Sequence, residues 1–194
     1  MSSLPTELLS VEAYLEGEQQ GDIRHEYLAG QIVAMVGASR AHALLCGALH
    51  ALLLPAARRQ GCQLFMADMK VRIDEGLDSY FYYPDLVLSC HAEDRHPFYV
   101  SQPVLIVEVL SPSTERIDSR EKLLAYRLLP SLREYLMLRQ DRAQADLYQR
   151  DEHGQWQHLR ISGLDGVLSL CSLDGLTVSL REIHADLPAS SGQP

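Results

Sequence analysis

The stretch that decides the fold is PVLIVEVLSPS, residues 103–113. A run of β-branched and aliphatic residues bounded by turn residues is typical of a strand buried on both faces. Glu108 lies in the middle of this run. An ionised carboxylate is costly to remove from water unless a cation, a metal ion or a shared proton compensates it. Either the strand is less buried than its composition indicates, or Glu108 has such a partner.

A second acidic residue interrupts the preceding apolar run, YFYYPDLVLSC, at residues 80–90. Asp85 follows Pro84, which lacks the N–H that a central strand needs and so marks an edge, a bulge or a strand start. Taken alone, Asp85 could simply be an aspartate at the start of a strand. Glu108, taken alone, could be satisfied by a buried arginine. The two acids are 108 − 85 = 23 residues apart, enough for one strand and a return. If the strands neighbour each other, both carboxylates converge on one point, where they repel unless a cation lies between them.

A divalent ion is the natural occupant of such a point. Mg²⁺ or Mn²⁺ prefers carboxylate oxygens, a backbone carbonyl and several retained waters. We therefore expect Asp85 and Glu108 to be metal ligands, with the carbonyl of Val109 as a further ligand. Such an ion supports phosphodiester hydrolysis, because it lowers the pKa of bound water and stabilises developing negative charge.

The segment that follows, residues 118–129, has the pattern of a helix. Asp118, Lys122 and Tyr126 are spaced four residues apart, which places them on one helical face. Lys122 comes early in this helix, so its ammonium can reach the end of the strand that carries Glu108 and orient a water or stabilise an oxyanion. The alternatives are that Asp118 is an N-cap, that Lys122 pairs with it on a solvated face, and that Tyr126 belongs to the core.

The remaining pattern predicts an α/β fold with a mixed sheet. Helices are also expected at 10–18, 39–60 and 179–186, and strands or hairpins at 27–35, 62–74, 133–140, 145–161 and 168–173. An antiparallel start followed by a βα crossover favours one mixed β-sheet flanked by helices on both faces.

Composition restricts the class of protein. A chain of 194 residues predicts a single domain, 1–187, with a polar tail, 188–194. No apolar run is long enough to cross a membrane, and the acidic N-terminus lacks the pattern of a secretory signal. Four scattered cysteines without a CxxC pair predict free thiols and a cytoplasmic protein. The net charge of −9 repels nucleic acid, so a nucleic-acid site needs a local basic patch.

The series PD…EVLSPST…D…K…Y resembles the large bacterial family of restriction-endonuclease-like proteins called Uma-two, of the PD-(D/E)XK nuclease superfamily. The resemblance extends from about Glu26 to Tyr135. It implies a restriction-endonuclease-like core and a metal-dependent phosphodiesterase site. Asp85 then corresponds to the PD acid and Glu108 to the (D/E) acid.

The resemblance also implies where the other site residues lie. The strict superfamily pattern has a lysine two residues after the second acid, where this chain has Leu110. The family moves that lysine to the following helix, here Lys122, whose long stem can place its amine similarly. Glu26 matches an upstream glutamate that would bind the metal or a water, with a solvent-facing hairpin acid as the equal alternative. His42 is a lesser candidate for a contact to phosphate or to a metal ligand, since a lone helical histidine is more often structural.

These observations favour a Mg²⁺-dependent (or Mn²⁺-dependent) endonuclease acting on DNA, with Asp85, Glu108, Lys122 and Glu26 as its catalytic residues. A homodimer is expected, because cutting both strands of a duplex favours two-fold symmetry. One alternative is a catalytically inactive relative that binds nucleic acid or protein, which the net charge and Leu110 favour mildly. Another is a metallohydrolase of small phosphate esters, since a fold does not choose its substrate.

Overall fold

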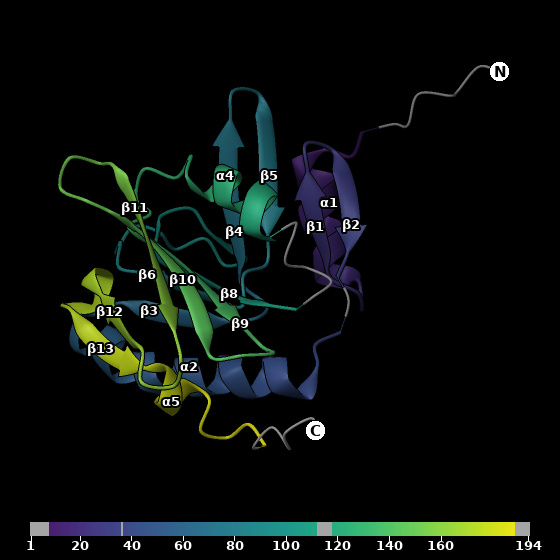
Figure 1. Cartoon of the computed structure of the whole chain (residues 1–194). Helices are drawn as coiled ribbons and strands as arrows, with labels where there is room; N and C mark the ends of the chain where they lie inside the picture. Colours follow the sequence, from purple (N-terminus) through teal and green to yellow (C-terminus); the bar gives the residue numbers. More distant parts are fainter. Residues whose placement is uncertain (1–7, 36, 112–117, 189–194) are drawn as a thin grey trace.

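The computed structural model describes residues 8–35, 37–111 and 118–188, the side chains of 118 and 119 excepted. Its strands form two larger sheets and one hairpin, with helices packed against them (Figure 1). The mixed α/β architecture predicted from the sequence is confirmed, but the strands form two larger sheets instead of the one mixed sheet expected.

The five-stranded sheet has the order β2-β1-β5-β4-β7. Its strands are β1 (His25–Leu28), β2 (Gln31–Ala34), β4 (Lys70–Glu75), β5 (Asp78–Tyr82) and β7 (Tyr99–Val100). The six-stranded sheet has the order β11-β10-β9-β8-β6-β3. Its strands are β3 (Gln63–Met66), β6 (Leu86–Ser89), β8 (Pro103–Leu110), β9 (Glu134–Arg139), β10 (Gln144–Arg150) and β11 (Trp156–Ser162).

Helical segments and a small hairpin complete the described chain. The helical segments are α1 (Val11–Gln20), α2 (Arg40–Arg59), the π-helix η1 (Asp118–Lys122), α4 (Leu123–Tyr126), the 3-10 turn η2 (Cys171–Leu173) and α5 (Leu180–Ile183). The hairpin pairs β12 (Val167–Leu170) with β13 (Leu176–Ser179). The helix predicted at 118–129 is thus a π-helical turn followed by one short α-helix. The cap predicted for Asp118 concerns a side chain outside the described residues.

Strand β8 lies at the centre of the six-stranded sheet, antiparallel to β6 and parallel to β9. All eight of its residues are buried. Because successive side chains of a strand point to opposite faces, Leu105, Val107 and Val109 join the core under α2. Ile106 and Leu110 join a second core that takes residues from both sheets and from α4. Glu108 therefore points toward the second core.

Helix α2 lies along the other face of the six-stranded sheet (Figure 1). Ser39 caps it by accepting a hydrogen bond from the backbone N–H of His42, at 3.1 Å. By length and composition it is the one described helix that could cross a membrane. Here Leu45, Leu49 and Leu53 are fully buried against the sheet, which is the position of a core helix.

Two predicted strands are each divided between the sheets. The run 62–74 gives β3 in one sheet and β4 in the other, and the run 80–90 gives β5 and β6. The first break contains Ala67 in the left-handed region, with φ of 64°. The second break contains Pro84, which cannot donate a ladder hydrogen bond. This second break leaves Asp85 between the two sheets.

The prediction of free thiols is wrong for two of the four cysteines. Cys62 and Cys90 form a disulfide. Strands β3 and β6 are antiparallel with Gln63 opposite Ser89, so the next pair outward places the two cysteines opposite each other. Their sequence separation of 28 positions gave no sign of this pairing. Among the described residues, Cys46 and Cys171 are free.

The N-terminal segments are close to their predicted positions. Ser10 caps α1, although the helix continues to Gln20 instead of ending near Gly17. The β1–β2 hairpin turns at Ala29-Gly30, both of which have positive φ. Strand β1 also pairs with β5.

Candidate active site

Glu108, on β8, has an ammonium and a phenol as partners. Its Oε1 lies 3.3 Å from Nζ of Lys122 and accepts a hydrogen bond of 3.0 Å from the hydroxyl of Tyr126. The Glu108 side chain is 5 % exposed and that of Lys122 is 8 % exposed. Burial, and then the negative charge of Glu108, raise the pKa of Tyr126 well above its usual range, so the phenol remains a donor. The strand is as buried as its composition indicated, and the carboxylate is compensated.

Lys122 joins this strand to the other sheet. Its Nζ lies 2.9 Å from Oε1 of Glu26, on β1, as well as near Glu108. The Glu26 side chain is 15 % exposed and that of Lys122 is 8 % exposed, so neither lies on the solvated face that the alternatives assumed. A pairing of Lys122 with Asp118 concerns a side chain outside the described residues. The Tyr82 ring is 5.7 Å from the ammonium, and burial together with the Glu26 charge raises the pKa of this tyrosine to about 12.

Asp85 directly precedes β6, the strand that pairs with β8 on the side away from β9. Leu86 pairs with Val107, so the next pair outward places Asp85 across from Glu108. The backbone N–H of Val109 donates to Oδ2 of Asp85 at 2.6 Å. The Asp85 carboxylate is thus fixed against the backbone of the strand that carries Glu108, and its side chain is 19 % exposed.

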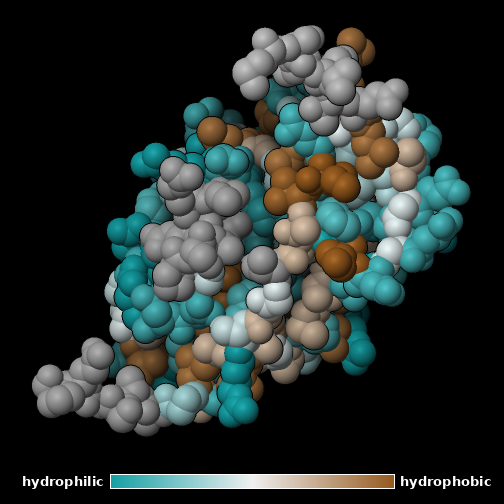
Figure 2. Space-filling model, turned by 90° about the vertical axis from the view of Figure 1, so that its right-hand side faces the viewer, coloured by the Kyte–Doolittle hydropathy of each residue, from teal (hydrophilic) through white to brown (hydrophobic). Residues whose placement is uncertain are grey.

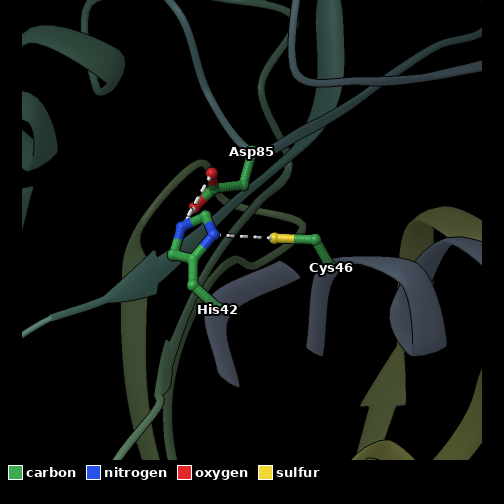
Figure 3. A group of neighbouring side chains, drawn as sticks. All are labelled: His42, Cys46 and Asp85. Carbon is green, nitrogen blue, oxygen red and sulfur yellow. Dashed lines mark hydrogen bonds and ion pairs between the residues drawn. The ribbon is translucent and has the colours of Figure 1, made fainter. Parts of the chain in front are cut away.

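His42 and Cys46 approach Asp85 from the first turns of α2 (Figure 3). The Nε2 atom of His42 lies 3.1 Å from both carboxylate oxygens of Asp85. Its Nδ1 lies 3.6 Å from Sγ of Cys46. Burial, followed by the charge of Asp85, raises the pKa of the Cys46 thiol, so that it is protonated at neutral pH.

The structure therefore brings together two groups of predicted residues. Lys122 links Glu26 to Glu108, and Asp85 is bonded to the backbone of Val109, the residue that follows Glu108. Two contributors were not anticipated. Cys46 follows His42 by four residues, a spacing that brings both to one helical face and that could have identified it. Tyr126 was expected in the core, where it lies, but its hydroxyl also binds Glu108.

The donor set fits a divalent cation. Two carboxylates, those of Glu26 and Glu108, contact the ammonium of Lys122, and a third, that of Asp85, is bonded to the backbone N–H of the residue that follows Glu108. Carboxylate oxygens near one another favour a bound cation, and carboxylates are the ligands that Mg²⁺ and Mn²⁺ prefer. Two hollows on the described surface, one along β10 to β12 and one beside the disulfide, are lined by other residues. The candidate site residues thus lie where the two sheets meet, away from these hollows.

Comparison with known proteins gives concordant results. A model of the Uma2 family, described as "Putative restriction endonuclease", matches residues 11–181. Two uncharacterised proteins of Synechocystis sp. are each 33 % identical to the chain. The first, slr1290, aligns over 95 % of this chain and 96 % of its own length, and the second, sll1609, over 81 % and 90 %.

A solved structure shows the same fold. It is a crystal structure from Anabaena variabilis described as "a putative nuclease belonging to DUF820". It superposes with a TM-score of 0.67 and covers 83 % of this chain and 89 % of its own, at 13 % sequence identity. This likeness supports a nuclease-like fold, and the family match extends over most of the sequence. The chain belongs to the Uma2 family of restriction-endonuclease-like proteins.

Proposed function

We propose that this protein is a metal-dependent endonuclease that hydrolyses the phosphodiester bonds of DNA with Mg²⁺ or Mn²⁺. Membership of the family and the nuclease-like fold support a nuclease in general. The observation that carries the proposal is the contact of Glu26 and Glu108 with the Lys122 ammonium where the two sheets meet, together with Asp85, which is bonded to the residue that follows Glu108. Carboxylates for a cation and an ammonium for the phosphate are the two requirements of this chemistry.

Each residue has a distinct role in the proposal. The carboxylates of Asp85 and Glu108 and the carbonyl of Val109 hold the ion, which when bound makes a coordinated water more acidic and neutralises charge on the phosphate. The ammonium of Lys122 stabilises the additional negative charge that develops on the phosphate. Glu26 holds that ammonium in position, at 2.9 Å. Its carboxylate also accepts the proton of the attacking water.

Cleavage of supercoiled plasmid DNA tests the proposal. With Mn²⁺ or Mg²⁺ present, the wild-type protein should nick the plasmid, and Glu108→Gln and Lys122→Met should each reduce the rate by about 100-fold or more. Asp146→Asn is the matched control, since Asp146 is also a buried carboxylate, paired with Arg160 on β11. Equal residual cleavage by all of these proteins would contradict the proposal.

The alternative is a nuclease-fold module that binds DNA or protein without cleaving it. Two observations favour it: Leu110 stands where the strict motif has lysine, and the chain carries a net charge of −9. Binding of a labelled duplex that is unchanged in Glu108→Gln, together with no cleavage by wild type in any divalent ion, would establish this alternative.

We place the homodimer interface at β2, the edge strand of the five-stranded sheet. All four of its residues are exposed, including Ile32 and Val33. Hydrophobic residues gather on this side of the molecule, which faces the viewer in Figure 2. An uncharged edge lets two acidic chains pair without repulsion, and exposed apolar edges invite pairing. Val33→Lys should convert the dimer to a monomer in light-scattering measurements, whereas a monomeric wild type would exclude this interface.

A cytoplasmic location is also part of the proposal, because DNA is the substrate. The Cys62–Cys90 disulfide does not support it, since disulfides are rare in reducing compartments. Alkylation of the protein inside intact cells should label Cys62 and Cys90 if the protein is cytoplasmic. It should label neither of these two cysteines if the protein resides in an oxidising compartment.

A further inference from the structure

The imidazole of His42 lies against an acid that the proposed function uses to bind metal. Its Nε2 is 3.1 Å from Oδ1 and 3.1 Å from Oδ2 of Asp85. Neighbouring ligands of one octahedral ion, with bonds of about 2.1 Å, are themselves about 3 Å apart. The nitrogen and a carboxylate oxygen are therefore spaced as two ligands of a single ion.

The other ring nitrogen has the kind of partner that metal-binding histidines have. Such histidines use one nitrogen for the ion and donate the N–H of the other to a fixed acceptor, which sets the tautomer and the orientation of the ring. Here Nδ1 faces Sγ of Cys46 at 3.6 Å, and Cys46 is buried one helical turn after His42. The Asp85 carboxylate is held in the same way, by the backbone N–H of Val109.

The position of the ring separates the role of Cys46 from that of His42. Among the described residues, His42, Cys46 and Asp85 form the one group of three whose candidate ligand atoms all lie within 4.8 Å of one another. However, the sulfur faces Nδ1 while the carboxylate faces Nε2, so the two groups contact different nitrogens of the ring (Figure 3). A single imidazole cannot present both nitrogens to one ion. Cys46 is thus a positioning residue that acts on His42.

We propose that His42, through Nε2, is a ligand of the same divalent ion as Asp85, and that the site consequently prefers a transition-metal ion such as Mn²⁺ to Mg²⁺. The inference rests on the proposed function only in taking Asp85 as a metal ligand. Imidazole nitrogen suits Zn²⁺, Fe²⁺ and Ni²⁺, and Mn²⁺ accepts it more readily than Mg²⁺, which prefers oxygen ligands and retains its waters. A nitrogen in the ligand set therefore shifts selectivity away from Mg²⁺.

Electron paramagnetic resonance of bound Mn²⁺ tests the inference without measuring activity. Protein labelled with ¹⁵N-histidine should show hyperfine coupling from one directly bound nitrogen. The coupling should persist in His50→Ala, a matched control two turns further along α2, and disappear in His42→Ala. A Mn²⁺ spectrum without nitrogen coupling in wild type would overturn the assignment.

Calorimetric titration supplies a second measurement. His42→Ala should weaken Mn²⁺ binding by at least 10-fold and Mg²⁺ binding by less, so that the preference for Mn²⁺ falls. Cys46→Ala, which removes the acceptor for Nδ1–H, should weaken Mn²⁺ binding by about 10-fold, while Cys171→Ser, at the exposed free thiol, should have no effect. Recovery of wild-type Mn²⁺ affinity in His42→Gln would contradict the inference, because it would show that an N–H donor to Asp85 suffices.

Failure of the inference and failure of the proposed function give different results. If Asp85→Asn and Glu108→Gln abolish Mn²⁺ binding but His42→Ala does not, the metal site stands and the role of His42 is refuted. If wild type binds neither Mn²⁺ nor Mg²⁺, both are refuted.

Discussion

Replacement of Lys122 by methionine separates the two tasks of this ammonium, which are holding the fold together and serving the site. Methionine keeps most of the apolar stem but removes the charge that lies 2.9 Å from Glu26 and 3.3 Å from Glu108. Removing one partner of a buried ion pair costs about 3–5 kcal/mol, because the other charge is left uncompensated. Since Glu26 retains some exposure, we expect a loss of about 3 kcal/mol.

Thermal unfolding followed by circular dichroism measures this loss. For a protein of this size, 1 kcal/mol corresponds to about 2–4 °C, so the melting temperature should fall by about 6–12 °C. A divalent ion can compensate the same carboxylates. At 100 times its dissociation constant, an ion that binds only the folded state adds about 2.7 kcal/mol. Mn²⁺ should therefore recover most of the lost stability of the variant.

The double variant Lys122→Met, Glu108→Gln provides the decisive comparison. If the cost arises from an uncompensated carboxylate, neutralising Glu108 should restore part of the stability, and the two substitutions should not be additive. Additive losses, or a Lys122→Met protein as stable as wild type, would refute the electrostatic reasoning.

Three further predictions follow from particular contacts. Tyr126→Phe removes a hydrogen bond to the buried Glu108 carboxylate and should lower the free energy of unfolding by about 2 kcal/mol, measured by urea titration. Reductant should lower it by about 3–4 kcal/mol through loss of the Cys62–Cys90 link, and should leave a protein with both cysteines changed to serine unaffected. Burial raises the pKa of Asp146, but hydrogen bonds from its arginine and histidine partners outweigh this and leave the pKa lowered from 3.8. Its folded pKa is below its unfolded pKa, so its stabilisation is present above pH ~4 and is lost as the pH falls further. Asp146→Asn should flatten that acid limb of the stability profile.

Local patterns in the sequence predicted the parts of the fold that depend on neighbouring residues. The aliphatic run of 103–110 predicted the central strand, because apolar residues at every position require burial on both faces. Ser10 and Ser39 predicted two helix starts, since their side chains satisfy backbone donors a few residues ahead. In the same way, an acid inside an apolar strand required a partner, and Lys122 lies beside it.

What the sequence did not predict depends on pairing between distant strands. The exchange of strands between two sheets near Ala67 and Pro84 is set by which partners the strands find, and a single sequence does not contain that information. The Cys62–Cys90 disulfide follows from the same β3–β6 pairing. The approach of Cys46 to the site depends on where α2 crosses the sheet, although its spacing from His42 was visible in the sequence.

A crystal soaked in Mn²⁺, measured for anomalous scattering, tests most directly whether Asp85 and Glu108 form one metal site. We predict a strong anomalous peak bonded to a carboxylate oxygen of each residue. A crystal without such a peak, in which Glu108 still binds Lys122 and Asp85 still binds the amide of Val109, would contradict it.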